Sequence, residues 1–212
     1  ALEGLELAYA YMQKKFTTEG ETVAPLWVKD GEKLSEWSFW NFGEQAKMGF
    51  PFEDGEEILV DKRAATYFYV TFLPSKLGGA TFYLTGLRDS DGNMLNGKDT
   101  YKLNVPSDVP AKDFWSAIVY NMETKNFNRG VDRVGASTKD LDKMIKNADG
   151  SVDVYYAPNL DEVPEGYEAN WVTTQSATDA NDWFFLFRLY RPETKDWFKT
   201  WMLNDVENIS DK

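Results

Sequence analysis

The feature that most constrains the fold is a series of short apolar runs in the second part of the chain, each bounded by turn-forming residues. In the run 100–105, apolar and polar residues alternate, as side chains do on the two faces of a strand. Asp-Gly and Asn-Gly pairs, which favour tight turns, separate several of the runs. This pattern favours an antiparallel β-sandwich over residues 80–212. The other expected strands are 80–88, 114–120, 152–157 and 183–190.

The N-terminal part follows a different pattern. Large apolar side chains recur every three or four residues over 2–16, which predicts an amphipathic helix. Glycines interrupt the ring-rich stretch 25–53, where we expect short helical turns and loops. Residues 56–73 fit both a strand and one face of a helix, and we expect a helix that ends at Pro74. The predicted class is therefore α+β but predominantly β, with a helical, aromatic-rich segment at 1–79.

Composition removes several classes of function. The chain has no Cys and no His, which excludes Ser-His-Asp triads, cysteine nucleophiles, Cys/His zinc sites and iron–sulfur ligation. With 35 acidic and 23 basic residues, the formal net charge is −12, which argues against binding to nucleic acid or to an anionic membrane. No apolar stretch reaches the roughly 18 residues that a membrane span needs. We expect no cofactor and no metal.

The chain begins with Ala1 rather than Met. We therefore expect a processed or truncated product, and the loss of a signal peptide or of an upstream domain fits this expectation.

Five short strings in the β-rich part occur together in a recognisable order. The strings are Tyr101-Lys102-Leu103, Phe114-Trp115-Ser116, Asp149-Gly150-Ser151-Val152, Asn170-Trp171 and Arg188-Leu189-Tyr190-Arg191-Pro192. Over about residues 80–205 the chain resembles the bacterial family called domain of unknown function 1214, which in longer relatives follows domain of unknown function 1254.

The resemblance implies a jelly-roll-like β-sandwich at 80–212 after a helical segment, and a further N-terminal β domain that is absent here. It also implies an exported protein, periplasmic or secreted, whereas the residues themselves leave a cytoplasmic location open. The family has no established function.

Arg188 is the first candidate for a ligand-binding residue. Strand alternation places Phe184, Leu186, Arg188 and Tyr190 on one face, and a guanidinium in such an apolar run must find partners. It would bind a carboxylate, phosphate or sugar hydroxyl through its planar fork of N–H groups. The alternative is a structural salt bridge to Asp or Glu on a neighbouring strand.

Asn170 and Trp171 are the second candidates, since they follow a loop rich in Pro, Gly and acidic residues. The amide would orient a ligand and the indole would stack on it, or both would simply anchor the loop. Tyr190, Trp115 and Tyr101 complete the predicted ligand-binding set. Trp115 and Tyr120 should lie on opposite faces of one strand, with Tyr120 in a core and its hydroxyl at the rim.

The string Asp89-x-Asp91-x-Asn93 matches the opening of a calcium-binding loop. The match fails afterwards, because Met94 stands where the loop needs Gly and Thr100 where it needs Glu. A turn in which Asp and Asn side chains cap their own backbone is the interpretation we adopt.

Three functions remain open. The first is a non-catalytic ligand-binding or structural module, which would hold a small molecule or a glycan in a groove with Arg188, Asn170 and Trp171 near one another. The second is a glycan hydrolase or lyase that uses two facing carboxylates. The third is a subunit of a larger assembly, either a homo-oligomer or a partner of a missing N-terminal domain, docked through a ring-rich patch between residues 25 and 53. We adopt the first.

Overall fold

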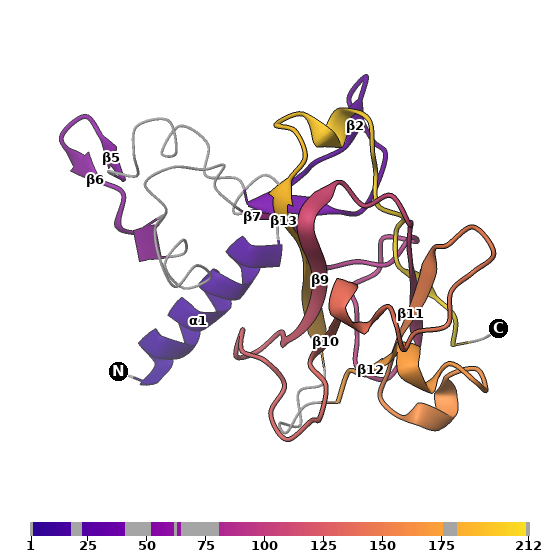
Figure 1. The fold of residues 1–212 in the computed structure, drawn as a ribbon. Helices are drawn as coiled ribbons and strands as arrows, with labels where there is room; N and C mark the ends of the chain where they lie inside the picture. The colour runs from indigo at the N-terminus through magenta and orange to yellow at the C-terminus, as the bar shows by residue number, and fades with distance from the viewer. Residues whose placement is uncertain are drawn as a thin grey trace.

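The computed structural model describes residues 2–17, 23–40, 52–61, 63–64, 81–175 and 182–210. These residues form a mostly β protein with one N-terminal helix, α1 (Leu2–Thr17), and mainly antiparallel sheets. Figure 1 shows the layers: α1 lies on one side of the larger sheet, and the smaller sheet lies on the other side.

The larger sheet has six strands in the order β1-β4-β7-β13-β9-β10, and all its pairings are antiparallel. Its centre is β13, which pairs with β7 on one side and with β9 on the other. The strands are β1 (Val23–Pro25), β4 (Ser38–Trp40), β7 (Thr81–Gly86), β9 (Ala111–Asn121), β10 (Gly135–Ser137) and β13 (Trp183–Pro192).

The smaller sheet has four strands in the order β12-β11-β8-β14, and only its β11–β12 pairing is parallel. Two hairpins stand apart, β2–β3 and β5–β6. The strands of the sheet are β8 (Tyr101–Val105), β11 (Val152–Ala157), β12 (Trp171–Thr173) and β14 (Glu207–Asn208), and those of the hairpins are β2 (Val28–Lys29), β3 (Glu32–Lys33), β5 (Glu53–Asp54) and β6 (Glu57–Ile58). Short 3-10 turns are η1 (Thr138–Asp140), η2 (Leu160–Glu162), η3 (Glu168–Asn170) and η4 (Trp197–Lys199).

The main core lies between the two sheets, and alternate residues of β13 supply much of it. Trp183, Phe185, Phe187 and Leu189 face this core and are fully buried. Phe185 lies 5.3 Å from the Tyr156 ring of β11, so the core joins the sheets directly. Large rings fill the space between two layers that lie about 10 Å apart.

A second apolar cluster lies on the outer face of the larger sheet. Phe184 and Leu186 of β13 face it, together with Tyr120 of β9. Phe16 of α1 packs edge-on against Phe184 with ring centroids 5.0 Å apart, and it is the only buried residue of the helix. The last turns of α1 therefore cover one end of this face, as Figure 1 shows.

The expected strands after residue 79 are confirmed, as is the helix predicted over 2–16. The helical turns predicted over 25–53 are wrong where that stretch is described, since it contains strands from β1 to β5. Two of these strands, β1 and β4, extend the larger sheet beyond β7, so the sheet draws strands from both sides of the predicted boundary at residue 79. The helix predicted over 56–73 is confirmed only in part: the stretch begins with β6, residues 60–61 and 63–64 are helical, and residues 62 and 65–73 lie outside the described residues.

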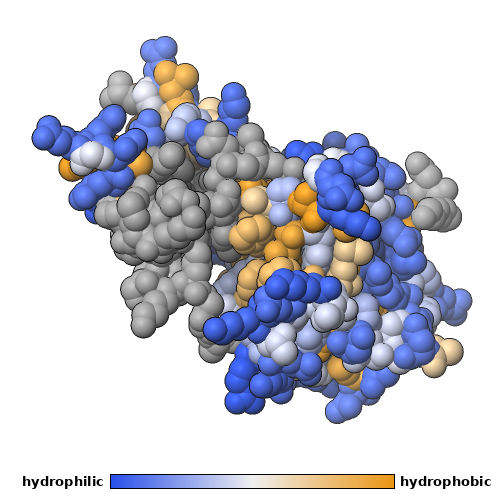
Figure 2. Space-filling view, turned by 90° about the horizontal axis from the view of Figure 1, so that it is seen from above, coloured by the Kyte–Doolittle hydropathy of each residue, from blue (hydrophilic) through white to orange (hydrophobic). Residues whose placement is uncertain are grey.

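The visible surface is largely hydrophilic, with apolar side chains gathered in a strip at the middle of the face that Figure 2 shows. This agrees with the formal net charge of −12. Within the described ranges, no helix combines the length and the apolar character that crossing a bilayer requires.

Candidate functional site

The six residues predicted to bind a ligand lie in three separate places. Arg188 and Tyr190 are on the outer face of the larger sheet, on the side of α1. Trp115 and Tyr101 lie between the sheets. Asn170 and Trp171 lie at the β12 edge of the smaller sheet. The structure therefore does not bring Arg188 together with Asn170 and Trp171 in one groove.

Tyr101 and Trp115 are part of the main core. Trp115 is stacked on Phe187 with ring centroids 5.4 Å apart. Tyr101 packs edge-on against Trp183, and its hydroxyl accepts a hydrogen bond from the backbone N–H of Asn96 at 3.1 Å. Both side chains are at most 5% exposed, so their observed contacts are those of packing residues.

The burial of Tyr101 predicts how stability changes at high pH. Burial is the main cause that raises the pKa of Tyr101 to about 12, and Asp99 adds to it. In the unfolded chain this phenol ionises near pH 10, so between pH 10 and 12 only the folded state retains the proton. We expect the free energy of unfolding to fall across this range, as measured by urea denaturation. Tyr101→Phe should make that fall shallower, and an unchanged pH profile in this variant would contradict the assignment.

Asn170 is completely buried and anchors the loop before β12. Its amide nitrogen donates to the backbone carbonyls of Ile145 at 2.9 Å and of Asp153 at 2.8 Å, and its Oδ1 accepts from the backbone N–H of Ile145 at 2.8 Å. Trp171 is half-buried, and its Nε1 donates to the carbonyl of Ala157 at 3.1 Å. These contacts match the loop-anchor alternative.

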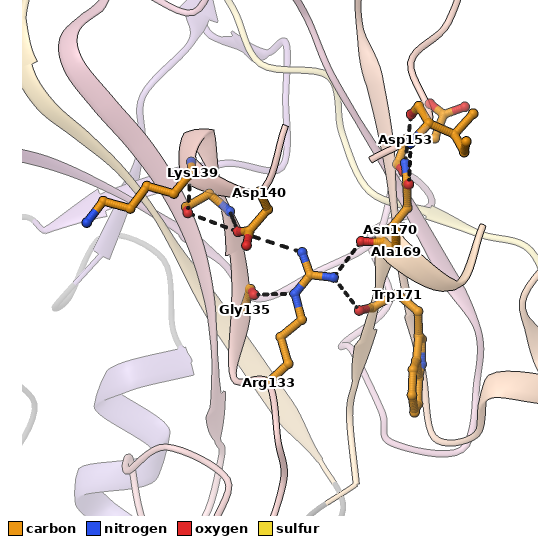
Figure 3. A network of polar contacts seen from close by, with 10 residues as sticks. Arg133, Gly135, Lys139, Asp140, Asp153, Ala169, Asn170 and Trp171 are labelled. Atoms are coloured by element: carbon orange, nitrogen blue, oxygen red, sulfur yellow. Dashed lines mark hydrogen bonds and ion pairs between the residues drawn. The ribbon is translucent and has the colours of Figure 1, made fainter. Parts of the chain in front are cut away.

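Arg133 is an important residue that sequence reasoning missed. As Figure 3 shows, its guanidinium bridges the two sheets. Its Nε donates to the Gly135 carbonyl at 2.9 Å, and Nη1 donates to the carbonyls of Ala169 at 2.7 Å and Trp171 at 2.9 Å. Asp140 lies 3.7 Å from Nη2 and compensates the charge. Most of these partners are backbone atoms, which no side-chain motif could reveal.

Arg188 is the centre of the candidate site. We call Arg188, Tyr83, Tyr120 and Tyr190 the Arg188–tyrosine cluster. Register places Tyr83 of β7 directly beside Arg188, and the guanidinium carbon lies 5.4 Å from the Tyr83 ring centroid and 5.7 Å from that of Tyr120. Nη2 donates to the Tyr120 hydroxyl, and Nη1 lies 3.5 Å from the Tyr190 hydroxyl. Three tyrosines from three adjacent strands thus lie around one cation, Tyr83 and Tyr120 through their rings and Tyr190 through its hydroxyl.

No carboxylate of the described residues neutralises the charge of Arg188. Among the ion pairs of the described residues none includes Arg188, whereas the neighbouring Arg191 lies 2.6 Å from Asp113. The Nε of Arg188 is also buried, and it has no hydrogen-bond partner among the described residues. A salt bridge of Arg188, the alternative to ligand binding, is therefore not formed with any carboxylate that the structure describes. Leaving a partly buried charge unpaired is costly, so the arrangement calls for a reason.

The environment also affects Tyr120. Burial raises the pKa of its phenol, while the positive charge of Arg188 acts in the opposite direction. The hydroxyl therefore stays protonated at neutral pH, so it can both accept from the guanidinium and donate to an anion. Sequence reasoning placed Tyr120 on the face opposite Trp115, which is confirmed, but it could not show that Tyr83 and Tyr120 flank Arg188.

A second polar surface lies over the smaller sheet. It is an open groove of about 1040 Å³ whose charged lining residues are Asp91, Asp149, Asp153, Asp205, Glu207 and Lys102. Burial raises the pKa of Asp205, although its Oδ1 accepts hydrogen bonds from the Ser35 hydroxyl at 2.6 Å and the Glu36 N–H at 2.9 Å. None of the six predicted ligand-binding residues lines this groove.

The Asp89 turn behaves as expected for a capped turn. The Oδ1 of Asp89 accepts from the backbone N–H groups of Asp91 at 3.0 Å and Asn93 at 2.9 Å. Asp89 is 1% exposed, so this carboxylate serves its own backbone.

Fold and site together define a mostly β protein with an arginine-centred aromatic cluster on the outer face of its larger sheet. The sequence model of one family matches residues 80–194, which is just over half of the chain. The chain belongs to this family, described as "Protein of unknown function (DUF1214)". The family resemblance read from the five strings is thereby confirmed.

Two solved structures are similar to this fold. The VPA0106 protein from Vibrio parahaemolyticus matches with a TM-score of 0.52 and 16% identity, over 70% of this chain and 35% of that one. An uncharacterised protein from Burkholderia cenocepacia has a TM-score of 0.38 and 17% identity, over 65% of this chain and 32% of that one. The chain thus spans about a third of the length of these proteins. No curated protein matches it.

Proposed function

We propose that this protein is a non-catalytic ligand-binding module that recognises an oxyanion at the Arg188–tyrosine cluster. One observation carries the proposal: the half-buried guanidinium of Arg188 has no carboxylate partner among the described residues, and its Nε has no hydrogen-bond partner there. A bound anion would neutralise the charge and accept hydrogen bonds from the guanidinium.

The cluster has the parts that such a site needs. The guanidinium offers a planar fork of donors, and the phenols of Tyr120 and Tyr190 lie beside it. The rings hold the side chain in place before any ligand binds, which reduces the ordering cost of binding. The chain as a whole carries a net charge of −12, so a local cation also distinguishes this face from most of the surface.

Replacement of Arg188 tests the proposal. Acetate and phosphate at constant ionic strength should raise the melting temperature of the wild type relative to chloride, because a ligand that binds only the folded state stabilises it. Arg188→Gln should weaken this binding at least about ten-fold, as expected for the loss of a charged hydrogen-bond donor.

Arg191→Gln is the matched control. Arg191 is the neighbouring arginine, but it is exposed and pairs with Asp113, so its replacement should leave the anion effect intact. An equal anion effect in both variants and the wild type would place the binding elsewhere and overturn the proposal.

One observation favours an enzyme as a second candidate. The groove over the smaller sheet holds several carboxylates, and burial raises the pKa of one of them, Asp205. A raised carboxyl pKa beside an ionised carboxylate is typical of glycosidases. Release of reducing sugar from any member of a glycan panel would favour this second function over the first.

Several finer assignments are proposals that follow from the family resemblance. We infer a jelly roll for the sandwich at 80–212, an upstream domain of unknown function 1254 in the parent protein, and export from the bacterial cytoplasm. The coverage of only 35% of the VPA0106 protein supports a longer parent chain. The exposed leucines at the start of α1, Leu2, Leu5 and Leu7, support a role in assembly with such a domain or a second copy.

A further inference from the structure

We infer that the anion held at the Arg188–tyrosine cluster is the carboxylate of a small aromatic acid whose ring stacks on Tyr190. The inference rests on the proposed function and adds the chemical class of the ligand to it.

The direction from which a ligand can reach Arg188 follows from the exposure along β13. On the outer face Phe184 is 3% exposed and Leu186 is 8% exposed, whereas Arg188 and Tyr190 are half-buried. Phe16 of α1 closes the Phe184 end. The Tyr190 end of this face is therefore the more open one, and we place the ligand there, beside the Tyr190 ring.

Aromatic stacking at this end is incomplete. Phe114 of β9 stacks on Tyr190 with centroids 3.9 Å apart and planes 17° apart, and the Nζ of Lys139 lies 5.6 Å from the Phe114 ring centroid. Since β13 lies between β9 and β7, the other face of Tyr190 is turned toward β7, the strand of Tyr83. No second ring stacks on Tyr190 within the part of the chain that the structure describes. A planar ligand ring placed there would continue the stack.

The donors at the site suit a carboxylate better than a phosphate. Phosphate sites usually combine cations with free backbone N–H groups. Here β13 is a central strand that pairs with both β7 and β9 around Arg188, so its backbone N–H groups are used within the sheet. What remains is one planar guanidinium with flanking phenols, which matches the two oxygens and the single charge of a carboxylate.

A ligand series measured by isothermal titration calorimetry on the whole chain tests the inference. Benzoate carries both the carboxylate and the ring, acetate only the carboxylate, and benzamide only the ring. We expect benzoate to bind several-fold to about ten-fold more tightly than acetate, since one aromatic stack is worth up to about a factor of ten. Benzamide and inorganic phosphate should bind more weakly than benzoate.

Two variants of Tyr190 separate stacking from charge recognition. Tyr190→Phe retains the ring and should retain the preference for benzoate over acetate. Tyr190→Leu lacks the hydroxyl, as Tyr190→Phe does, and also removes the stacking plate, so its affinities for benzoate and acetate should become similar. The wild-type series decides the question by itself if Tyr190→Leu does not fold.

The outcomes distinguish this inference from the function on which it rests. Equal affinities of the wild type for acetate and benzoate, both lost in Arg188→Gln, would overturn the aromatic class while the oxyanion site stands. Phosphate binding more tightly than benzoate would overturn the carboxylate class. No binding of any anion, or binding unchanged in Arg188→Gln, would overturn the inference and the proposed function together.

Discussion

Replacement of Phe185 by alanine is expected to lower the free energy of unfolding by about 3–5 kcal/mol. Phe185 is fully buried near the start of β13 and contacts rings from several parts of the chain. Its ring centroid lies 5.0 Å from that of Trp37, 5.3 Å from that of Tyr156 and 5.5 Å from that of Trp183. Truncation removes the transfer free energy of the ring and leaves a cavity that these large neighbours can fill only in part.

Phe127→Ala is the control for this prediction. The same side chain is 50% exposed there, so its loss should cost less than about 1 kcal/mol. Urea denaturation of both variants measures the difference. A loss below about 1.5 kcal/mol for Phe185→Ala would mean that the two sheets do not share the core described above.

Asn170→Asp should destabilise the fold by at least about 3 kcal/mol at pH 7. The replacement keeps the shape of the side chain but puts an oxygen where the amide nitrogen donates to the carbonyls of Ile145 and Asp153. It also places a negative charge at a position with no solvent exposure. Burial should raise the pKa of the new carboxyl, so the deficit relative to the wild type should shrink as the pH falls toward 4.

Asn126→Asp supplies the comparison, because Asn126 is exposed and should tolerate the change. Denaturation curves at several pH values measure both variants. A stable Asn170→Asp protein with impaired ligand binding would return Asn170 to the ligand site, where sequence reasoning had placed it.

The candidate site shows how far the sequence carries a functional prediction. Arg188 is identified as unusual from sequence because a cation interrupts an apolar strand, and Tyr190 joins it by alternation. Tyr83 and Tyr120 come from other strands, and nothing local marks them as neighbours of Arg188. Asn170 attracts attention because it is polar and follows a loop, yet its amide is used entirely to hold backbone groups.

The sequence by itself determines where the longer strands run and which of their residues share a face. The reason is that side chains alternate strictly along a strand, so the apolar pattern of 183–190 separates a core face from an outer face without knowledge of the partners. The short strands β1 and β4 have only three residues each, too few to show an alternation of apolar and polar side chains. They form because β4 pairs with the edge of β7, and β1 then pairs with the edge of β4.

Only the tertiary structure decides what surrounds Arg188. Strand order is set by pairing between segments far apart in the chain, and the order β7-β13-β9 brings Tyr83 and Tyr120 to the guanidinium while it brings no described carboxylate within ion-pair distance. Whether a cation in an apolar strand is neutralised or left open to a ligand depends on these long-range neighbours, and alternation along one strand carries no information about them.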